Sequence, residues 1–172
     1  MKNTRRIHTT LATALVLALT SLPSLAHGQE RGTSKATVGK AQVSIEYGRP
    51  ELKGRDMFSK MQAGAVWRIG ANDPTTLTTD ADLDFAGKRL AKGKHILLAR
   101  FAEGGKWSLL ASSKGAFQFE DSAVLASIPL TLSTAKDSVE QLTITLGAKG
   151  DNGTIEIAWG TSRLSGSFAC AK

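Results

Sequence analysis

The sequence predicts an all-β fold. We expect an antiparallel β-sandwich, and a jelly roll is one arrangement that fits the pattern. Apolar residues recur with a period of two in almost every segment after residue 36, which is the pattern of half-buried strands. About eight to ten such segments are short and are joined by glycine-rich turns, as in sandwiches and barrels. Only residues 56–62 have a helical pattern, so we expect one short helix of about two turns.

The amino terminus predicts a cleavable secretory signal peptide over residues 1–26. Three positive charges, Lys2, Arg5 and Arg6, precede a short apolar run, and a small-x-small pattern ends at Ala26. This order is typical of bacterial signal peptides, and the run is shorter than the roughly 20 residues that span a bilayer. We therefore expect a periplasmic or secreted protein. The general secretory route is favoured, although the arginine pair also resembles a twin-arginine signal.

Charge and cysteine content exclude several classes of protein. The formal charge falls from +7 to +4 without Lys2, Arg5 and Arg6, which is ordinary for one domain and predicts no nucleic-acid partner. The single cysteine, Cys170, excludes an internal disulfide and is expected to be buried. Nothing after residue 26 is long and apolar enough to predict a transmembrane anchor.

After the signal, small polar residues over 27–35 predict a flexible leader, and residues 36–172 form the single domain. The turn over residues 149–153 predicts a tight hairpin, because Asp-Asn-Gly accepts positive φ. Pro129 places its strand at an edge or a bulge. The inward faces of the expected strands are Val43-Ile45-Tyr47, Leu97-Ala99-Phe101, Trp107-Leu109-Ala111, Val124-Ala126-Ile128-Leu130-Leu132, Leu142-Ile144-Leu146, Ile155-Ile157-Trp159 and Leu164-Gly166-Phe168-Cys170.

The parity of the first strand has a consequence for Arg49. If Val43, Ile45 and Tyr47 face the core, Arg49 has the same inward parity, and Pro50 ends the strand there. An unpaired buried charge is costly, so the guanidinium must sit at the mouth of the sandwich and hold an acceptor.

Two motifs resemble those of domain-of-unknown-function family 2911. Residues 47–55, Tyr-Gly-Arg-Pro-Glu-Leu-Lys-Gly-Arg with Phe58 close behind, resemble its opening motif. Residues 66–72, Val-Trp-Arg-Ile-Gly-Ala-Asn followed by two threonines, resemble its second and most distinctive one. A glycine-spaced hairpin fits a third motif, formed by Gly87, Leu90, Gly93 and Leu97.

The resemblance covers essentially the whole chain after the signal and implies an exported bacterial β-protein. It transfers no catalytic or binding residue. The sequence departs from the family pattern at His95, where an aromatic residue, usually tyrosine, is expected, and at Ala91, where proline is common.

The two motif segments predict the candidate binding site. Arginine presents a planar fork that grips carboxylates, phosphates or sulfates, so we expect a pocket for an anion or a sugar acid at one end of the sandwich. The alternative is that Arg49 and Arg68 only pin the two loops through Asp73, Glu51 or backbone carbonyls. The candidate residues are Tyr47 and Trp67 as a stacking wall, with Arg49, Lys53, Arg55, Arg68, Asn72 and Asp73.

Other patterns predict no metal, cofactor or catalytic residue. The Asp80-x-Asp82-x-Asp84 run lacks the glycine and glutamate of a calcium loop, so we interpret it as a solvated strand face with Lys88 and Arg89 as partners. His95 shares a face with Leu97 and is interpreted as a packed or rim histidine.

These observations favour a non-catalytic exported domain that binds an anionic or carbohydrate-like envelope component. Two alternatives stay open. One is a small periplasmic hydrolase that uses Asp73 or Glu51 near His95. The other is a purely structural or protein-binding module, for which an exposed strand edge near Pro129 would be the sign.

Overall fold

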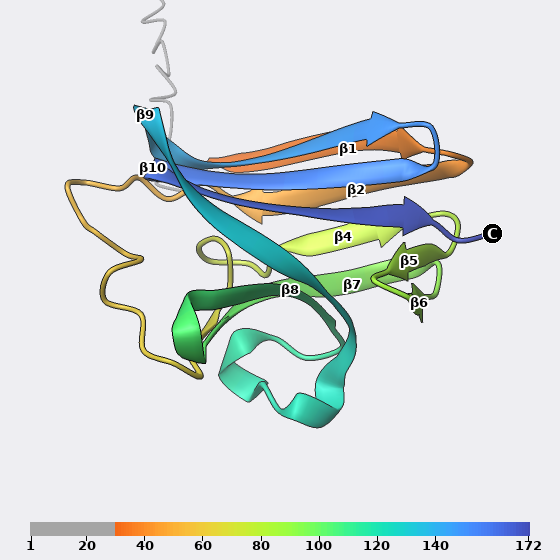
Figure 1. The fold of residues 1–172 in the computed structure, drawn as a ribbon, viewed down its shortest axis with the longest axis horizontal. Coiled ribbons are helices and arrows are strands. Elements are labelled where there is room, and N and C mark those ends of the chain that lie inside the picture. The colour runs from red at the N-terminus through yellow and green to blue at the C-terminus, as the bar shows by residue number, and fades with distance from the viewer. Residues whose placement is uncertain (1–29) are drawn as a thin grey trace, which may run out of the picture.

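The computed structural model describes residues 30–172 (Figure 1). The predicted signal peptide and residues 27–29 of the predicted leader lie outside the described residues. Ten strands and three short 3-10 turns make up the fold. The strands are β1 (Arg31–Val38), β2 (Ala41–Gly48), β3 (Val66–Trp67), β4 (Thr76–Thr79), β5 (Leu83–Phe85), β6 (Lys88–Leu90), β7 (Gly93–Ala102), β8 (Lys106–Ser112), β9 (Val124–Lys149) and β10 (Asn152–Cys170).

The strands form one continuous antiparallel sheet that folds over on itself, and the predicted all-β sandwich is confirmed. The order is β1-β2-β4-β7-β8-β9-β10-β5-β6, with β3 paired to β7. Neighbours in the sheet are mostly consecutive in the chain, so the topology is a meander and not the jelly roll that was considered. The exceptions are β3, which pairs with β7, and the β5–β6 hairpin, which leaves its sequence neighbours to pair with β10 (Figure 1).

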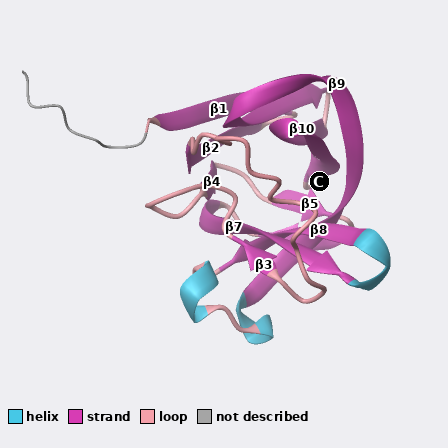
Figure 2. Ribbon diagram, turned by 90° about the vertical axis from the view of Figure 1, so that its left-hand side faces the viewer, coloured by secondary structure: helices cyan, strands magenta, loops and turns pink. Residues whose placement is uncertain are grey.

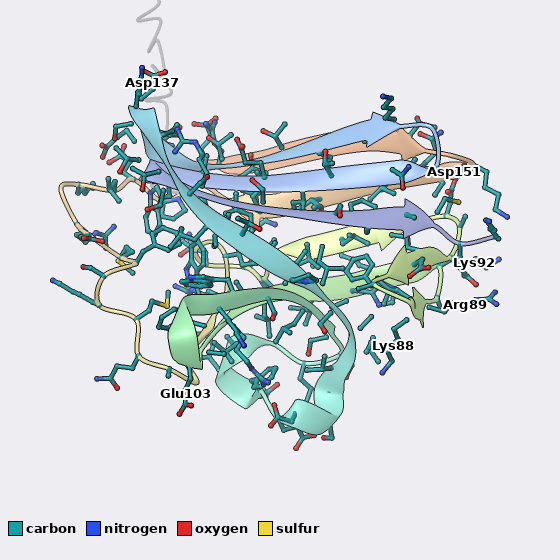
Figure 3. All side chains as sticks on the ribbon, in the orientation of Figure 1. Lys88, Arg89, Lys92, Glu103, Asp137 and Asp151 are labelled. Carbon is teal, nitrogen blue, oxygen red and sulfur yellow. The ribbon has the colours of Figure 1, made fainter. Side chains whose placement is uncertain are left out.

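The long strands β9 and β10 turn a corner together. Their pairing passes from Val139↔Gly160 to Thr134↔Ser162, so residues 135–138 bulge out of the ladder. Gly160 has φ +60°, a conformation that favours glycine. Asp137 marks this corner in Figure 3. Beyond the corner both strands run back, and β9 comes to lie beside β1.

Side-chain contacts close the fold between β1, β2 and β9. The backbone N–H of Leu146 donates to Ser34 Oγ at 2.8 Å, and the buried Tyr47 hydroxyl donates to the carbonyl of Ile144 at 3.3 Å. The core that these contacts enclose follows the predicted alternation. Its fully buried side chains include Ile45, Leu77, Leu97, Leu109, Ile128, Leu142 and Ile155.

The predicted flexible leader is wrong for residues 31–35. They belong to β1, which pairs with β2 along its whole length. The inward positions of β1 hold small residues because β2 fills the space beneath them. A Cβ on Gly32 would stand 2.6 Å from the Tyr47 ring and 2.9 Å from Arg49 Cδ. A strand with small inward residues shows no apolar alternation, which is why the pattern missed it.

The predicted helix over residues 56–62 is also wrong, because this segment is irregular. Tertiary contacts hold it. Phe58 meets the edges of Trp67 and Trp107, each at 5.5 Å between centroids, and Met57 and Met61 also pack against the core. A helix of two turns is only marginally stable by itself, so the tertiary contacts decide the conformation of this segment. The only helical turns in the described chain are 3-10 turns, which lie at the periphery around β3, β7 and β8 (Figure 2).

The predicted inward position of Leu132 is also wrong, because its side chain is 44% exposed. Beyond Leu130, β9 leaves its pairing with β8 and approaches the corner, where few elements cover it. The strand of Pro129 is not an edge strand, because β9 lies between β8 and β10. Pro129 itself pairs only with Ser108 of β8, since the ladder with β10 begins at Thr131, so the position but not the strand is paired on one side.

Candidate functional site

Arg49 lies at the end of β2, as its parity predicted, and the protein itself occupies it. Its Nη1 contacts Glu30 Oε1 at 2.9 Å, and its Nε donates a long hydrogen bond of 3.5 Å to the carbonyl of Leu142. The side chain is 26% exposed. Arg49 therefore joins β1, β2 and β9, which is the structural role that we considered as the alternative.

The other charged residues of the first motif are also held internally. Arg55 donates to the carbonyls of Leu52 and Glu51, at 3.0 and 2.7 Å. Lys53 Nζ lies 3.3 Å from the Glu51 carboxylate. Asp73 of the second motif segment forms an exposed ion pair of 3.5 Å with Arg31.

The two aromatic candidates belong to the core. Tyr47 and Trp67 are 4% and 9% exposed. Trp67 stacks on Trp159 with centroids 6.0 Å apart and rings nearly parallel. Neither ring presents a face to solvent, so neither forms the expected stacking wall.

The two motif segments do meet, but through their backbones. A Cβ added to Gly48 would collide with the Ala71 carbonyl and would stand 2.9 Å from the Ala71 nitrogen. Close behind, the Thr75 hydroxyl donates to the Ile69 carbonyl at 2.6 Å and is completely buried. This contact holds Ile69, the residue next to Arg68.

Arg68 is the one arginine of the predicted site that no acceptor holds. Trp67 points into the core, so its neighbour Arg68 points outward. It forms no hydrogen bond or ion pair with any residue in 30–172, and it is half-buried. Its guanidinium carbon lies 5.5 Å from the ring centroid of Phe117. The lone contact is therefore a cation–π interaction, which leaves the fork of nitrogen donors free.

Arg68 and Phe117 border a hollow of about 130 Å³. Asn72, in the left-handed conformation with φ +61°, turns the chain at one rim. Phe117 is 88% exposed, which is unusual for an aromatic side chain. The remaining walls come from β7 and the loops on either side of it, and they are formed by Pro74, Thr75, Ile96, Leu97, Leu98, Gly115 and Ala116.

Phe117 belongs to the β8–β9 loop, residues 113–123. This loop carries a second aromatic–arginine contact, because Phe119 lies 5.0 Å from the guanidinium of Arg100 on β7. Arg100 also pairs with Asp121 of the same loop. The loop is thus anchored at Arg100, while Arg68 remains available beside Phe117.

The sequence pattern that defines one protein family, described as "Protein of unknown function (DUF2911)", matches residues 29–168. The chain belongs to the DUF2911 family. The suspected family is therefore confirmed, and the match covers every strand described above except the last two residues of β10. Neither the curated proteins nor the solved structures include one that matches this chain.

In this DUF2911 domain, the sequence brings Arg68 and Asn72 to one hollow and leaves the other six candidates elsewhere. Phe117 was missed. The available signal was a phenylalanine in a short, mostly polar segment between two strands, where no core position needs one. No helix in residues 30–172 is long and apolar enough to cross a membrane.

The prediction for the aspartate run is confirmed only in part, because Arg89 pairs with it but Lys88 forms no ion pair with it in the described chain, and only Asp84 lies on a strand. Asp82 pairs with Arg89, Asp84 Oδ1 accepts from the N–H of Gly87 at 2.6 Å, and Asp80 Oδ1 accepts from the N–H of Gln42 at 2.7 Å. The backbone N–H of Lys92 and then the Arg89 side chain donate to Asp82, and these bonds hold the pKa of its carboxyl below the usual value. His95 is half-buried, and its Nε2 lies 2.7 Å from the carbonyl of Ala91.

Proposed function

We propose that this DUF2911 protein is a non-catalytic binding module of the periplasm or the extracellular medium. Its ligand is a small anionic component of the cell envelope that carries a ring. The observation behind the proposal is the free guanidinium of Arg68 at the rim of a hollow, with no acceptor among the described residues.

The charge of the hollow favours an anion. Arg68 is the only charged residue among those that line it, and most of its walls are apolar. A guanidinium beside apolar walls interacts with a carboxylate more strongly than one surrounded by water. Its fork accepts two carboxylate, phosphate or sulfate oxygens side by side.

The size of the hollow favours a single ring. A cavity of about 150 Å³ holds one benzene molecule, and this hollow measures about 130 Å³ and is open on one side. The exposed Phe117 ring offers a face against which a flat ring can stack. A ring that carries one carboxylate, whether aromatic or a sugar acid, meets both requirements.

The geometry gives less support to a hydrolase. None of the hollows described for residues 30–172 is lined by His95, Glu51 or Asp73. Glu51 and Asp73 instead form exposed ion pairs with Lys53 and Arg31. We therefore do not carry the hydrolase forward.

Binding can be tested with ligand pairs that differ in charge. Benzoate is compared with benzyl alcohol, and glucuronate with glucose, by calorimetric titration and by the rise in Tm that a specific ligand produces. We expect the acid of at least one pair to bind and its neutral counterpart to bind at least about tenfold more weakly. A tenfold change in Kd corresponds roughly to the free energy of one charge-assisted hydrogen bond.

Arg68→Gln should weaken binding of the acid about tenfold or more and change the free energy of unfolding by less than about 1 kcal/mol. Lys106→Gln makes the same change of charge at an exposed position and should leave binding unchanged. Equal binding of acid and neutral compound, or a loss of several kcal/mol of stability in Arg68→Gln, would show that Arg68 is structural.

The proposed location is tested by mass spectrometry of the protein recovered from the periplasm or the medium. We expect the mature chain to begin at His27.

A further inference from the structure

A second hollow lies at the corner of β9 and β10. Residues of the first motif that do not line the Arg68 hollow form part of its wall. The second hollow measures about 280 Å³. The segment after β2 forms one wall through Arg55, Asp56 and Phe58. The corner forms the other through Ser138, Trp159 and Ser162, with Thr161 beside them.

The walls of this corner hollow are fixed before any ligand arrives. Leu52 packs against the corner, where a Cβ on Gly160 would stand 3.1 Å from its Cδ2. The two backbone carbonyls described above hold the guanidinium of Arg55, which lies 6.0 Å from the Trp159 ring centroid. Asp56 Oδ1 accepts from the N–H of Ser59 at 3.1 Å. A site with its polar groups already in place loses less free energy to ordering on binding.

The chemistry of the corner hollow differs from that of the Arg68 hollow. It contains one positive and one negative side chain, so it has no net preference for an anion. Hydrogen bonds from Ser59, first from its backbone and then from its side chain, hold the pKa of Asp56 below the usual value, so this carboxylate is an acceptor at neutral pH. Three hydroxyls, from Ser138, Thr161 and Ser162, both donate and accept.

The Trp159 ring forms part of the wall of the corner hollow. Its indole N–H is buried and has no acceptor among the described residues, so it is a local reporter of the wall and not a contact for an occupant.

We propose that the corner hollow binds a neutral polyhydroxylated ligand, one sugar unit of a glycan. Paired donors and acceptors match hydroxyl groups, which both donate and accept, and the volume lies just below the range of about 300–1,000 Å³ for small-molecule sites, as suits one sugar unit. This inference is independent of the Arg68 hollow, with which the corner hollow shares no lining residue.

The test follows the indole N–H signals of the three tryptophans by NMR, with the Trp159 signal assigned through Trp159→Phe. Methyl glucoside, methyl mannoside and methyl galactoside are titrated separately to about 100 mM, because single sugar units bind with Kd near the millimolar range. We expect at least one of them to shift the Trp159 signal saturably, and glucuronate to bind at least about tenfold more weakly than that sugar.

Two variants test the contacts. Asp56→Asn should weaken sugar binding about tenfold. The double variant Ser138→Ala/Thr161→Val removes two hydroxyls that make no hydrogen bond in the described chain, so it should fold normally. It should also weaken sugar binding about tenfold. Arg68→Gln should leave sugar binding within about twofold, which separates this result from that of the Arg68 hollow.

The inference is overturned if no neutral sugar moves the Trp159 signal by about 100 mM. It is equally overturned if glucuronate binds as tightly as the neutral sugar, or if the double variant binds the sugar as the unmodified protein does.

Discussion

Arg49 and Arg68 are the same side chain in neighbouring motifs, and the surrounding backbone decides what each one does. Arg49 emerges between β1 and β9, where Glu30 and the carbonyl of Leu142 lie within reach. Arg68 follows a buried tryptophan and emerges where only Phe117 meets it. A guanidinium has five N–H donors and bonds to acceptors that lie near it. It can therefore bind a ligand only where the fold leaves some of these donors without an acceptor.

Gly48 determines this placement, and its substitution is the prediction at the scale of the residue. Gly48→Ala forces a methyl group into the backbone of Ala71, which cannot move without displacing the second motif. We expect a loss of at least about 2 kcal/mol in the free energy of unfolding, measured by urea denaturation. Gly115→Ala is the control, because Gly115 has φ −75° and nothing lies within 4 Å of its added Cβ. Similar losses in both variants would contradict the close approach.

At the scale of the element, the β5–β6 hairpin shows how carboxylates stabilise a short strand pair. The ladder between β5 and β6 covers only three residue pairs. Asp82 supplements it by accepting from the N–H of Lys92 at 2.7 Å and by pairing with Arg89 across the hairpin. Asp82, together with Asp84 in the turn, thus fixes a small element that its own ladder holds weakly.

The lowered pKa of Asp82 gives this element a pH dependence. An aspartate whose pKa is lower in the folded than in the unfolded state stabilises the fold above its unfolded pKa of about 3.9, and this contribution is lost as the pH falls through the folded value. Asp82→Asn should therefore be less stable than the unmodified protein at pH 7, and the difference should shrink as the pH falls below about 4. Urea denaturation at a series of pH values measures this.

Asp137→Asn is the control for that series, since no donor contacts the Asp137 carboxylate in the described chain. It should follow the pH profile of the unmodified protein. A difference between Asp82→Asn and the unmodified protein that stays constant down to pH 2 would show that the ionised carboxylate is not what stabilises the hairpin.

The elements also show how far sequence reasoning reaches. Strands with large inward residues, such as 43–47 and 155–159, were predicted from their period of two because burial of alternate side chains is a local property. β1 was missed because its inward positions hold small residues, beneath which Tyr47 of another strand fills the space. The helix over 56–62 was predicted from local pattern, but Phe58 is held by distant Trp67 and Trp107.

The candidate site follows the same division. Parity correctly directed Arg49 inward, and the second motif included Arg68 and Asn72. The partners of these residues could not be predicted, because they come from distant parts of the chain. Glu30 lies opposite Arg49 because β1, which the pattern missed, pairs with β2, and Phe117 reaches Arg68 from the β8–β9 loop.

At the scale of the whole molecule, the two proposed sites depend on how the sheet is closed. The corner hollow exists because β9 and β10 fold back at residues 135–138 and Gly160. The returning half of β9 is then fastened to the other end of the sheet. Backbone bonds join it to the segment after β2, and the Ser34 hydroxyl of β1 accepts the N–H of Leu146. A single side chain thus links the first strand to a residue far along the chain.

Ser34→Ala tests this closure. The variant leaves the partly buried N–H of Leu146 without its acceptor, so we expect a loss of about 1–2 kcal/mol in the free energy of unfolding and faster hydrogen exchange at the Leu146 amide. Thr33→Ala, at the neighbouring exposed position of the same strand, should change stability by less than about 0.5 kcal/mol and leave that amide protected. If the Leu146 amide remains equally protected from hydrogen exchange in Ser34→Ala, backbone hydrogen bonds alone hold the returning half of β9. In that case β1 packs beside β9 without stabilising its position. The corner hollow would then owe its shape to the segment after β2, because the Leu52 and Leu142 amides bond to β9 and Pro50 there.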